Sequence, residues 1–290
     1  MDLSHRVWKY LLGISLLGQG FAYAALPVQY ASPMGKENWK MSGNPLRCGL
    51  SLTIPEYGIA YFEQYATKTP HFILRKWSEV QRPSSALVMV NSPLWKPNGN
   101  TYAIARTFVK PGKYGIYLTR EPTLKLLTFL YKGYQGTFSY QSEQGFAETV
   151  VISPIKFQKV YSKYQQCLSG LLDFNYAEVR ESVFFFDVDN YELTDDDQNQ
   201  LRKIVAYVNA DSTIEKVKIT GHSDDTGRKG YNNAVSQFRA ETVRNYLLKL
   251  GLPSKKLSTT WVGQMKPIAR NDTEQGRAEN RRVVVLLKKR

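Results

Sequence analysis

The sequence has 290 residues and a formal net charge of +14, with 39 lysines and arginines against 25 acidic residues. This length favours two domains. With two cysteines and no Cys-x-x-Cys pair, the composition argues against redox catalysis and against a cysteine-rich zinc site.

The first 24 residues have the pattern of a cleaved signal peptide. Arg6 and Lys9 precede an apolar run over residues 10–17, and Ala22-Tyr23-Ala24 places small residues where a signal peptidase reads. The run is too short to cross a bilayer easily, and an uncleaved membrane anchor is the alternative. No cysteine precedes Cys48, so we expect no lipid anchor. We therefore expect the mature chain in the periplasm, where nucleic acid is not a partner despite the basic charge.

Short β-rich runs dominate residues 25–173, which we expect to form the N-terminal domain. Proline, glycine, asparagine and lysine separate them, a pattern typical of a compact antiparallel sheet or a small barrel. After Ser153-Pro154, apolar residues recur at helical spacing from Phe157 to Leu171 and predict a closing helix that carries Cys167. The expected strands are 51–54, 58–65, 72–77, 86–90, 102–109 and 149–152.

Cys48 and Cys167 are predicted to form a disulfide, because an exported chain folds in an oxidising compartment. The bridged positions lie 167 − 48 = 119 apart. A loop of that length would stabilise the fold by about 4 to 5 kcal/mol in the chain-entropy model. The bridge would staple the closing helix to the first strand; two buried free thiols are the alternative.

Charge divides unevenly between the two halves. Residues 25–173 hold 17 basic and 8 acidic residues, a surplus of +9, whereas residues 174–290 hold 20 and 16, a surplus of +4. A basic surface favours anionic partners such as lipid headgroups or an acidic protein face, and a solvated surface without a partner is the alternative. The segment 173–180 is expected to link the two domains.

Strands and helices are predicted to alternate over residues 174–290. Thr194 starts a helix, with Asp197 in a capping-box position and an apolar stripe behind it. The whole order is β-α-β-α-β-β, which implies an α/β sandwich with helices on one side of a mixed sheet. The strands are predicted at 183–188, 214–220, 257–262 and 282–287, and the second helix from Asn233. The inner face of the sheet is predicted to consist of Phe184, Phe186, Val217, Ile219 and Val284.

Asp224 and Arg239 form the most informative pair in the sequence. Asp224 lies just beyond the strand that ends at Gly221, where an α/β layer commonly keeps its ligands. Arg239 falls on the same helix face as Val243 and Leu247. An unpaired buried charge costs several kcal/mol, so this arginine must snorkel to the edge or pair with an anion. The pair would suit a small zwitterion.

A series of short motifs runs in order through residues 184–287. They are Gly221-His222-Ser223-Asp224, Tyr231-Asn232, Ser236 with Arg239-Ala240, Gly263, Lys266-Pro267-Ile268, Asn271-Asp272-Thr273, Gly276-Arg277 and Asn280-Arg281-Arg282-Val283. Together these motifs resemble the OmpA-type peptidoglycan-binding domain.

The resemblance implies that Asp224 and Arg239 hold the diaminopimelate of the wall's stem peptide. Diaminopimelate offers an ammonium and a carboxylate at one end, which suit a carboxylate and a bidentate arginine respectively. Asn232 would add an amide contact, and Ser223, which stands where threonine is commoner in the family, keeps the hydroxyl. Further candidates for the pocket are Asp187 and Asp189, for which the alternative is a turn-forming role, and Arg281.

A second resemblance covers the N-terminal half and, with the C-terminal motifs, nearly the whole chain. It rests on Trp39-x-Met41, Asn44-Pro45-Leu46-x-Cys48, Pro93-x-Trp95-x-Pro97, Thr137-Phe138-Ser139-Tyr140 and Cys167. These residues resemble the MotY family, periplasmic components of sodium-driven polar flagellar motors. The resemblance implies an anchor that forms a ring, the T ring, around the basal body. Its N-terminal domain would join the basal body and a MotX-like partner, so that stator units assemble and resist torque.

Two other classes of function are alternatives. A general OmpA-like envelope tether would share the wall site but not the flagellar role. A murein hydrolase would need a nucleophile, an acid or a metal, and His71 and His222 fall in different domains. His222 with Asp224 and Asp225 resembles half of a metal site, although a hydrogen-bonded histidine at a strand end is the simpler interpretation. We therefore expect no catalytic residue, no metal and no cofactor.

Overall fold

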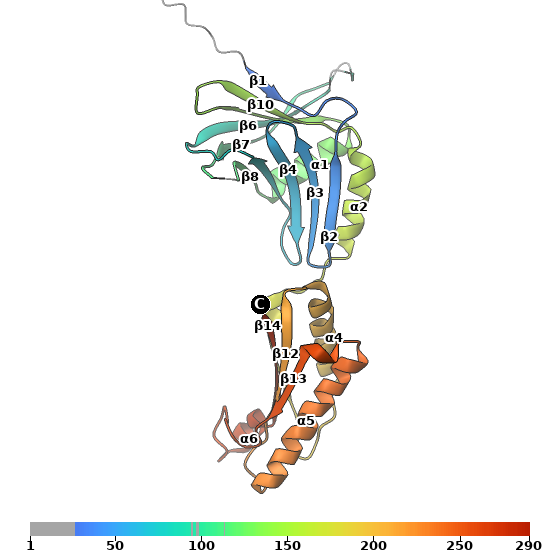
Figure 1. The fold of residues 1–290 in the computed structure, drawn as a ribbon, viewed down its shortest axis with the longest axis vertical. Coiled ribbons are helices and arrows are strands. Elements are labelled where there is room, and N and C mark those ends of the chain that lie inside the picture. Colours follow the sequence, from blue (N-terminus) through green and yellow to red (C-terminus); the bar gives the residue numbers. More distant parts are fainter. Residues whose placement is uncertain (1–26, 94, 97–98, 113) are drawn as a thin grey trace, which may run out of the picture.

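The computed structural model describes residues 27–93, 95–96, 99–112 and 114–290, so the predicted signal peptide lies outside the described residues. Two domains follow each other along the longest axis of the molecule (Figure 1). Each has its own cluster of buried apolar side chains. Within the described part of the chain, no helix is long and apolar enough to cross a membrane.

The N-terminal domain contains two five-stranded sheets. All neighbouring strands are antiparallel except the first pair, β1 and β10, which are parallel. The first sheet has the order β1 (Val28–Tyr30), β10 (Ala147–Ile152), β9 (Gln135–Gln141), β6 (Ser84–Asn91) and β7 (Tyr102–Val109). The second has the order β2 (Trp39–Asn44), β3 (Arg47–Ile54), β4 (Gly58–Tyr65), β5 (His71–Lys76) and β8 (Ile116–Leu118).

The two sheets bury one side each in a shared core. Alternate residues point inward, so Leu50 and Leu52 of β3 lie in the same buried cluster as Val88 of β6. Phe72 of β5 stacks on Phe138 of β9 with ring centroids 5.2 Å apart, which joins the sheets directly. The predicted mainly antiparallel β domain is confirmed, with two packed sheets as its form.

Two helices cover this domain, α1 (Arg120–Tyr131) and α2 (Phe157–Ser169). The sequence predicted α2 but not α1. Cys167 of α2 and Cys48 of β3 form the predicted disulfide, with their Cα atoms 6.0 Å apart. The bridge joins α2 to the strand predicted at residues 51–54, which is part of β3, so this expectation is confirmed. The strands β1 and β2, which precede β3, were not predicted.

The segment predicted as a linker is ordered and contains a short helix, α3 (Tyr176–Val179). Asn175 caps it in a capping box with Glu178, which satisfies backbone donors at both ends of the first turn. Just before it, the backbone N–H of Leu172 donates to Pro45 O of the β2–β3 turn at 2.8 Å. Hydrogen bonds therefore tie the connection to the N-terminal domain.

The C-terminal domain has a four-stranded sheet, and its two long helices lie on one side of it (Figure 1). The strand order is β11 (Glu181–Phe185), β14 (Arg282–Lys289), β12 (Ile214–Gly221) and β13 (Leu257–Trp261). β12 pairs in parallel with β13 and antiparallel with β14, which makes the sheet mixed as predicted. The helices are α4 (Asp195–Ala210), α5 (Lys229–Lys249), the 3-10 turn η1 (Ser254–Lys256) and α6 (Glu274–Asn280), the last two unpredicted.

The core of this domain confirms most of the predicted inner face and corrects one strand. Phe184 and Ile219 are buried as expected. Val284 is not in the core, whereas its neighbours Val283 and Val285 are. Phe184 pairs with Val283 across the sheet, and cross-strand partners share a face. The prediction of Val284 was therefore wrong by one residue, because successive side chains of a strand point to opposite faces.

Candidate functional site

At the end of β12, the backbone of Gly221 packs closely against the backbone of Ser236 in α5. A Cβ on Gly221 would lie 2.0 Å from the carbonyl oxygen of Ser236, so only glycine fits at this strand end. Ser236 also uses its hydroxyl, which accepts a hydrogen bond from the N–H of Gly263 at 3.0 Å. These contacts hold the loop that carries Asp224 against the helix that carries Arg239.

A cavity of about 140 Å³ opens between this loop and α5. The structure brings six of the seven predicted residues to its wall, namely Ser223, Asp224, Asn232, Arg239, Asp189 and Arg281. The seventh, Asp187, does not line the cavity. It contributes only its backbone carbonyl, which accepts a hydrogen bond from Arg239.

Arg239 is enclosed, with 1% of its surface exposed, so the snorkelling alternative is wrong. Its guanidinium donates to the carbonyl oxygens of Asp187 at 2.7 Å, Asn190 at 3.0 Å and His222 at 3.5 Å. It also lies over the ring of Phe186, 5.5 Å from the centroid. These partners are all neutral. Burial lowers the pKa of Arg239 to about 10. The negative charge of Asp224 opposes this shift, whereas the positive charge of Arg281 adds to it. The group is charged at neutral pH and has no hydrogen-bonded anion among the described residues.

Asp224 is paired with Arg281 rather than with Arg239. Its Oδ2 accepts from the Arg281 guanidinium at 3.0 Å, and its Oδ1 accepts from the N–H of Thr226 at 3.2 Å. Arg281 also donates to Glu274 Oε1 at 2.9 Å. Burial alone would lower the pKa of Arg281, but the hydrogen bonds to Asp224 and Glu274 outweigh it and raise the pKa. Arg281 therefore orients the carboxylate that the sequence singled out.

The remaining predicted residues shape the rim and wall. Asn232 is buried and donates to Gly227 O at 2.9 Å and to Gln264 Oε1 at 2.6 Å, so it braces the loop. The Ser223 hydroxyl is buried and has no hydrogen-bond partner among the described residues. The carboxylate of Asp189 is exposed and accepts a hydrogen bond from the hydroxyl of Tyr231.

Sequence reasoning missed the roles of Tyr231, Thr226 and Gln264 at this site. Tyr231 stands in the Tyr231-Asn232 motif, which was a signal for it. Gln264 offered none, because only the fold brings it within hydrogen-bond distance of Asn232. Thr226 acts through its backbone N–H, and any residue other than proline can supply that donor.

The cavity can receive a ligand that carries both signs of charge. Asp224 and Glu274 both pair with Arg281, whereas Arg239 donates only to neutral carbonyls, so the Arg239 guanidinium is available to an incoming carboxylate. A free lone pair on Asp224 can accept from an ammonium, since a carboxylate has about four acceptor positions. An enclosed site strengthens both interactions because water screens them less.

His222, which precedes Ser223 and Asp224 in the chain, is a structural residue and does not line the cavity. It is 6% exposed, and burial, with the positive charges of Arg282 and Lys266, lowers its pKa to about 4. It is therefore neutral at pH 7. No group of three or more histidine, cysteine, aspartate or glutamate residues in the described ranges could hold a metal ion.

Both halves of the chain match known protein families. The family model for the MotY N-terminal domain matches residues 30–173, and the OmpA family model matches residues 185–281. The sodium-type flagellar protein MotY of Vibrio parahaemolyticus is 29% identical over 287 residues, which cover 97% of each chain. The chain belongs to the MotY family. Both resemblances expected from the sequence are thereby confirmed.

Two further similar proteins match about a third of this MotY-family chain. The outer-membrane lipoprotein YfiB of Pseudomonas aeruginosa is 39% identical over 95 residues, which cover 33% of this chain and 56% of YfiB. The crystal structure of the peptidoglycan-associated lipoprotein from Burkholderia pseudomallei is 31% identical, with a TM-score of 0.35. It covers 37% of this chain and 89% of that one.

Proposed function

We propose that this MotY-family protein is a non-catalytic periplasmic anchor that binds peptidoglycan through the cavity beside α5. The observation that carries the proposal is the buried guanidinium of Arg239, hydrogen-bonded only to neutral carbonyls and adjacent to the Asp224–Arg281 pair. Such a site leaves one positive charge for a ligand carboxylate.

The ligand is proposed to be the diaminopimelate of the stem peptide. Its free carboxylate would approach Arg239, and its ammonium would donate to Asp224, which Arg281 holds in place. The buried hydroxyl of Ser223 would supply a further hydrogen bond. An amino acid with a neutral side chain would leave Asp224 without its ammonium partner, and unpaired buried groups reduce affinity.

We propose that the N-terminal domain binds the structure that is anchored to the wall. Because the chain belongs to the MotY family, this structure would be the flagellar basal body, with a MotX-like protein as partner and the T ring as the assembly. Attachment of the ring to the wall would let sodium-driven stator units assemble and resist torque. The surplus positive charge of residues 25–173 is compatible with docking to an acidic protein surface.

Retention on isolated sacculi tests the wall site. We expect Arg239→Lys and Asp224→Asn to weaken retention at least tenfold, a loss of about 1.5 kcal/mol or more. Lysine cannot make the bidentate contact of a guanidinium, and asparagine lacks the negative charge that pairs with an ammonium. Arg244→Lys, on the same helix but outside the cavity, is the matched control. Circular dichroism checks that each variant is folded. Equal retention of all variants would refute the site, and release of muropeptides would indicate a hydrolase instead.

A deletion strain tests the flagellar role. We expect loss of swimming, loss of the periplasmic ring in images of the basal body, and loss of stator recruitment. Complementation with Asp224→Asn should restore the ring less well than the unmodified gene. Normal swimming in the deletion strain would instead favour a general envelope tether.

A further inference from the structure

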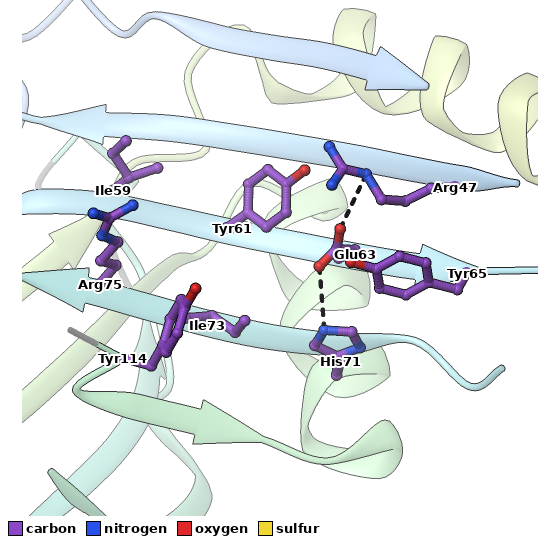
Figure 2. Close-up of a pocket in the computed structure, with 9 residues that line it drawn as sticks. All are labelled: Arg47, Ile59, Tyr61, Glu63, Tyr65, His71, Ile73, Arg75 and Tyr114. Carbon is purple, nitrogen blue, oxygen red and sulfur yellow. Dashed lines mark ion pairs between the residues drawn. The ribbon is translucent and has the colours of Figure 1, made fainter. Parts of the chain in front are cut away.

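The outer face of the second N-terminal sheet carries a groove that the wall site does not use. Strand faces turned toward water are commonly polar, yet here Tyr61 and Ile73 form the middle of a hollow of about 500 Å³ (Figure 2). Ile59, Arg75 and Tyr114 lie at one end, and Arg47, Glu63 and His71 lie at the other. We call this hollow the β4 groove.

The aromatic rings of the groove are held in place by contacts with their neighbours. A Cβ on Gly49 of β3 would come within 2.3 Å of the Tyr61 hydroxyl, so the glycine allows this ring to lie across the adjacent strand. Tyr65 stacks on His71 at 6.2 Å, and His71 stacks on Tyr117 at 5.4 Å between ring centroids. The groove therefore has a shaped aromatic wall rather than a set of independent surface side chains.

At one end of the groove, a buried carboxylate lies between Arg47 and His71. Glu63 is 5% exposed, and its carboxylate lies 3.1 Å from Arg47 Nε and 3.4 Å from His71 Nε2. Glu63 Oε1 has almost no accessible surface, so Arg47 and His71 occupy the space around this carboxylate. This end of the groove therefore offers a ligand the ring faces and the paired Arg47 rather than a free acceptor.

The other end of the groove presents an unused positive charge. Arg75 is exposed, and its guanidinium forms no ion pair or hydrogen bond within the ranges that the structure describes. Arg47 is different, since Glu63 already balances its charge. With the surplus of +9 over residues 25–173, the end at Arg75 is electrostatically suited to a carboxylate.

We propose that the β4 groove binds an extended peptide segment of a partner protein in which an acidic side chain adjoins an apolar one. The acidic side chain would pair with Arg75, and the apolar side chain would cover Ile73 and Tyr61. A neutral glycan would stack on the rings but would leave Arg75 without an anion, so the charges favour a peptide. The proposal is independent of wall binding, because all these residues lie in the N-terminal domain.

Fluorescence anisotropy with the full chain and a synthetic peptide tests the proposal. The probe is a fluorescein-labelled hexapeptide with two aspartates, two leucines, a threonine and a glycine, and its comparison peptide carries asparagine in place of aspartate. We expect the acidic peptide to bind at least tenfold more tightly than the amide peptide. Arg75→Gln should remove this preference, because the charged contact is worth about a factor of ten.

Arg106→Gln is the matched control, since it removes the same charge from an exposed position on β7 of the other sheet. It should keep the preference, and both variants should keep the sacculus retention of the unmodified chain. Equal binding of the two peptides, or equal effects of the two arginine variants, would overturn the proposal. Competition by a chitooligosaccharide with no acidic preference would do the same and assign the groove to a glycan.

Discussion

The two proposed binding sites differ in how their charged side chains are held. In the C-terminal cavity of about 140 Å³, Asp224 and Arg239 are both nearly enclosed, and carbonyls or partner side chains orient them. In the β4 groove of about 500 Å³, Arg75 is exposed and has no anion beside it in the described residues. A preorganised, enclosed site can discriminate a small zwitterion, whereas an open, aromatic-lined face can accommodate a longer and more variable segment.

The domains should also differ in what stabilises them, and the largest expected effect is in the N-terminal one. The double variant Cys48→Ala and Cys167→Ala removes a bridge across 119 positions. We expect the free energy of unfolding of the N-terminal domain to fall by about 4 kcal/mol, because the unfolded chain gains loop entropy. Calorimetry of the full chain should show only the N-terminal transition at a lower temperature.

A shift of the C-terminal transition by a similar amount would contradict the view that each core unfolds by itself. The separate buried clusters support that view, although Leu46 of the N-terminal half packs against the C-terminal core. The single variant Leu46→Ala measures how far this contact couples the transitions. If the coupling is weak, removing the disulfide should lower the free energy of unfolding of the N-terminal domain by the same amount with Leu46 and with Leu46→Ala.

Much of this organisation is accessible from the sequence, and the exceptions have physical causes. The strands β4 and β7 were predicted with the bounds that the structure has, because β-rich runs and turn residues mark them. Helix α1 was missed, since Pro122 and a nearly continuous apolar stretch hide its helical period. The cavity residues Asp224 and Arg239 were found, but the partner of Asp224, Arg281, lies 57 residues away and no local pattern links them.

The second largest expected effect is a loss of stability of the C-terminal domain at acidic pH. The pKa of His222 is about 4 in the folded protein, against 6.5 for an unperturbed histidine. Between these values the unfolded state binds the proton and the folded state does not, so stability rises with pH. The domain should have its full stability above pH 6.5 and lose about 3 kcal/mol as the pH falls to 4.

Calorimetry at several pH values checks this expectation on the C-terminal transition. His222→Gln removes the titrating group and should flatten the dependence between pH 6.5 and 4. The cations that face the imidazole, Arg282 and Lys266, keep their charge throughout this range. A slope that persists in His222→Gln would assign the acid sensitivity to other groups.

The smallest expected effect compares one helix from each domain. Thr194 caps α4, and its hydroxyl accepts a hydrogen bond from the N–H of Asp197 at 3.2 Å. Thr119 occupies the same position of α1 without a side-chain cap. We expect Thr194→Ala to destabilise its domain by about 1 kcal/mol and Thr119→Ala by less than about 0.5 kcal/mol. Urea denaturation measures both, and equal effects would show that the cap contributes nothing specific.

The sequence by itself determined many of the local elements and the candidate residues Asp224 and Arg239, because periodicity, capping residues and short motifs act over a few neighbouring residues. The disulfide pair followed from the presence of only two cysteines. Only the tertiary structure decided which face of β14 is buried, which arginine holds Asp224, and that Arg75, Tyr61 and Glu63 lie along one groove. These features depend on strand order and register between distant segments. Local propensities do not encode them, since a shift of one residue reverses every side chain of a strand.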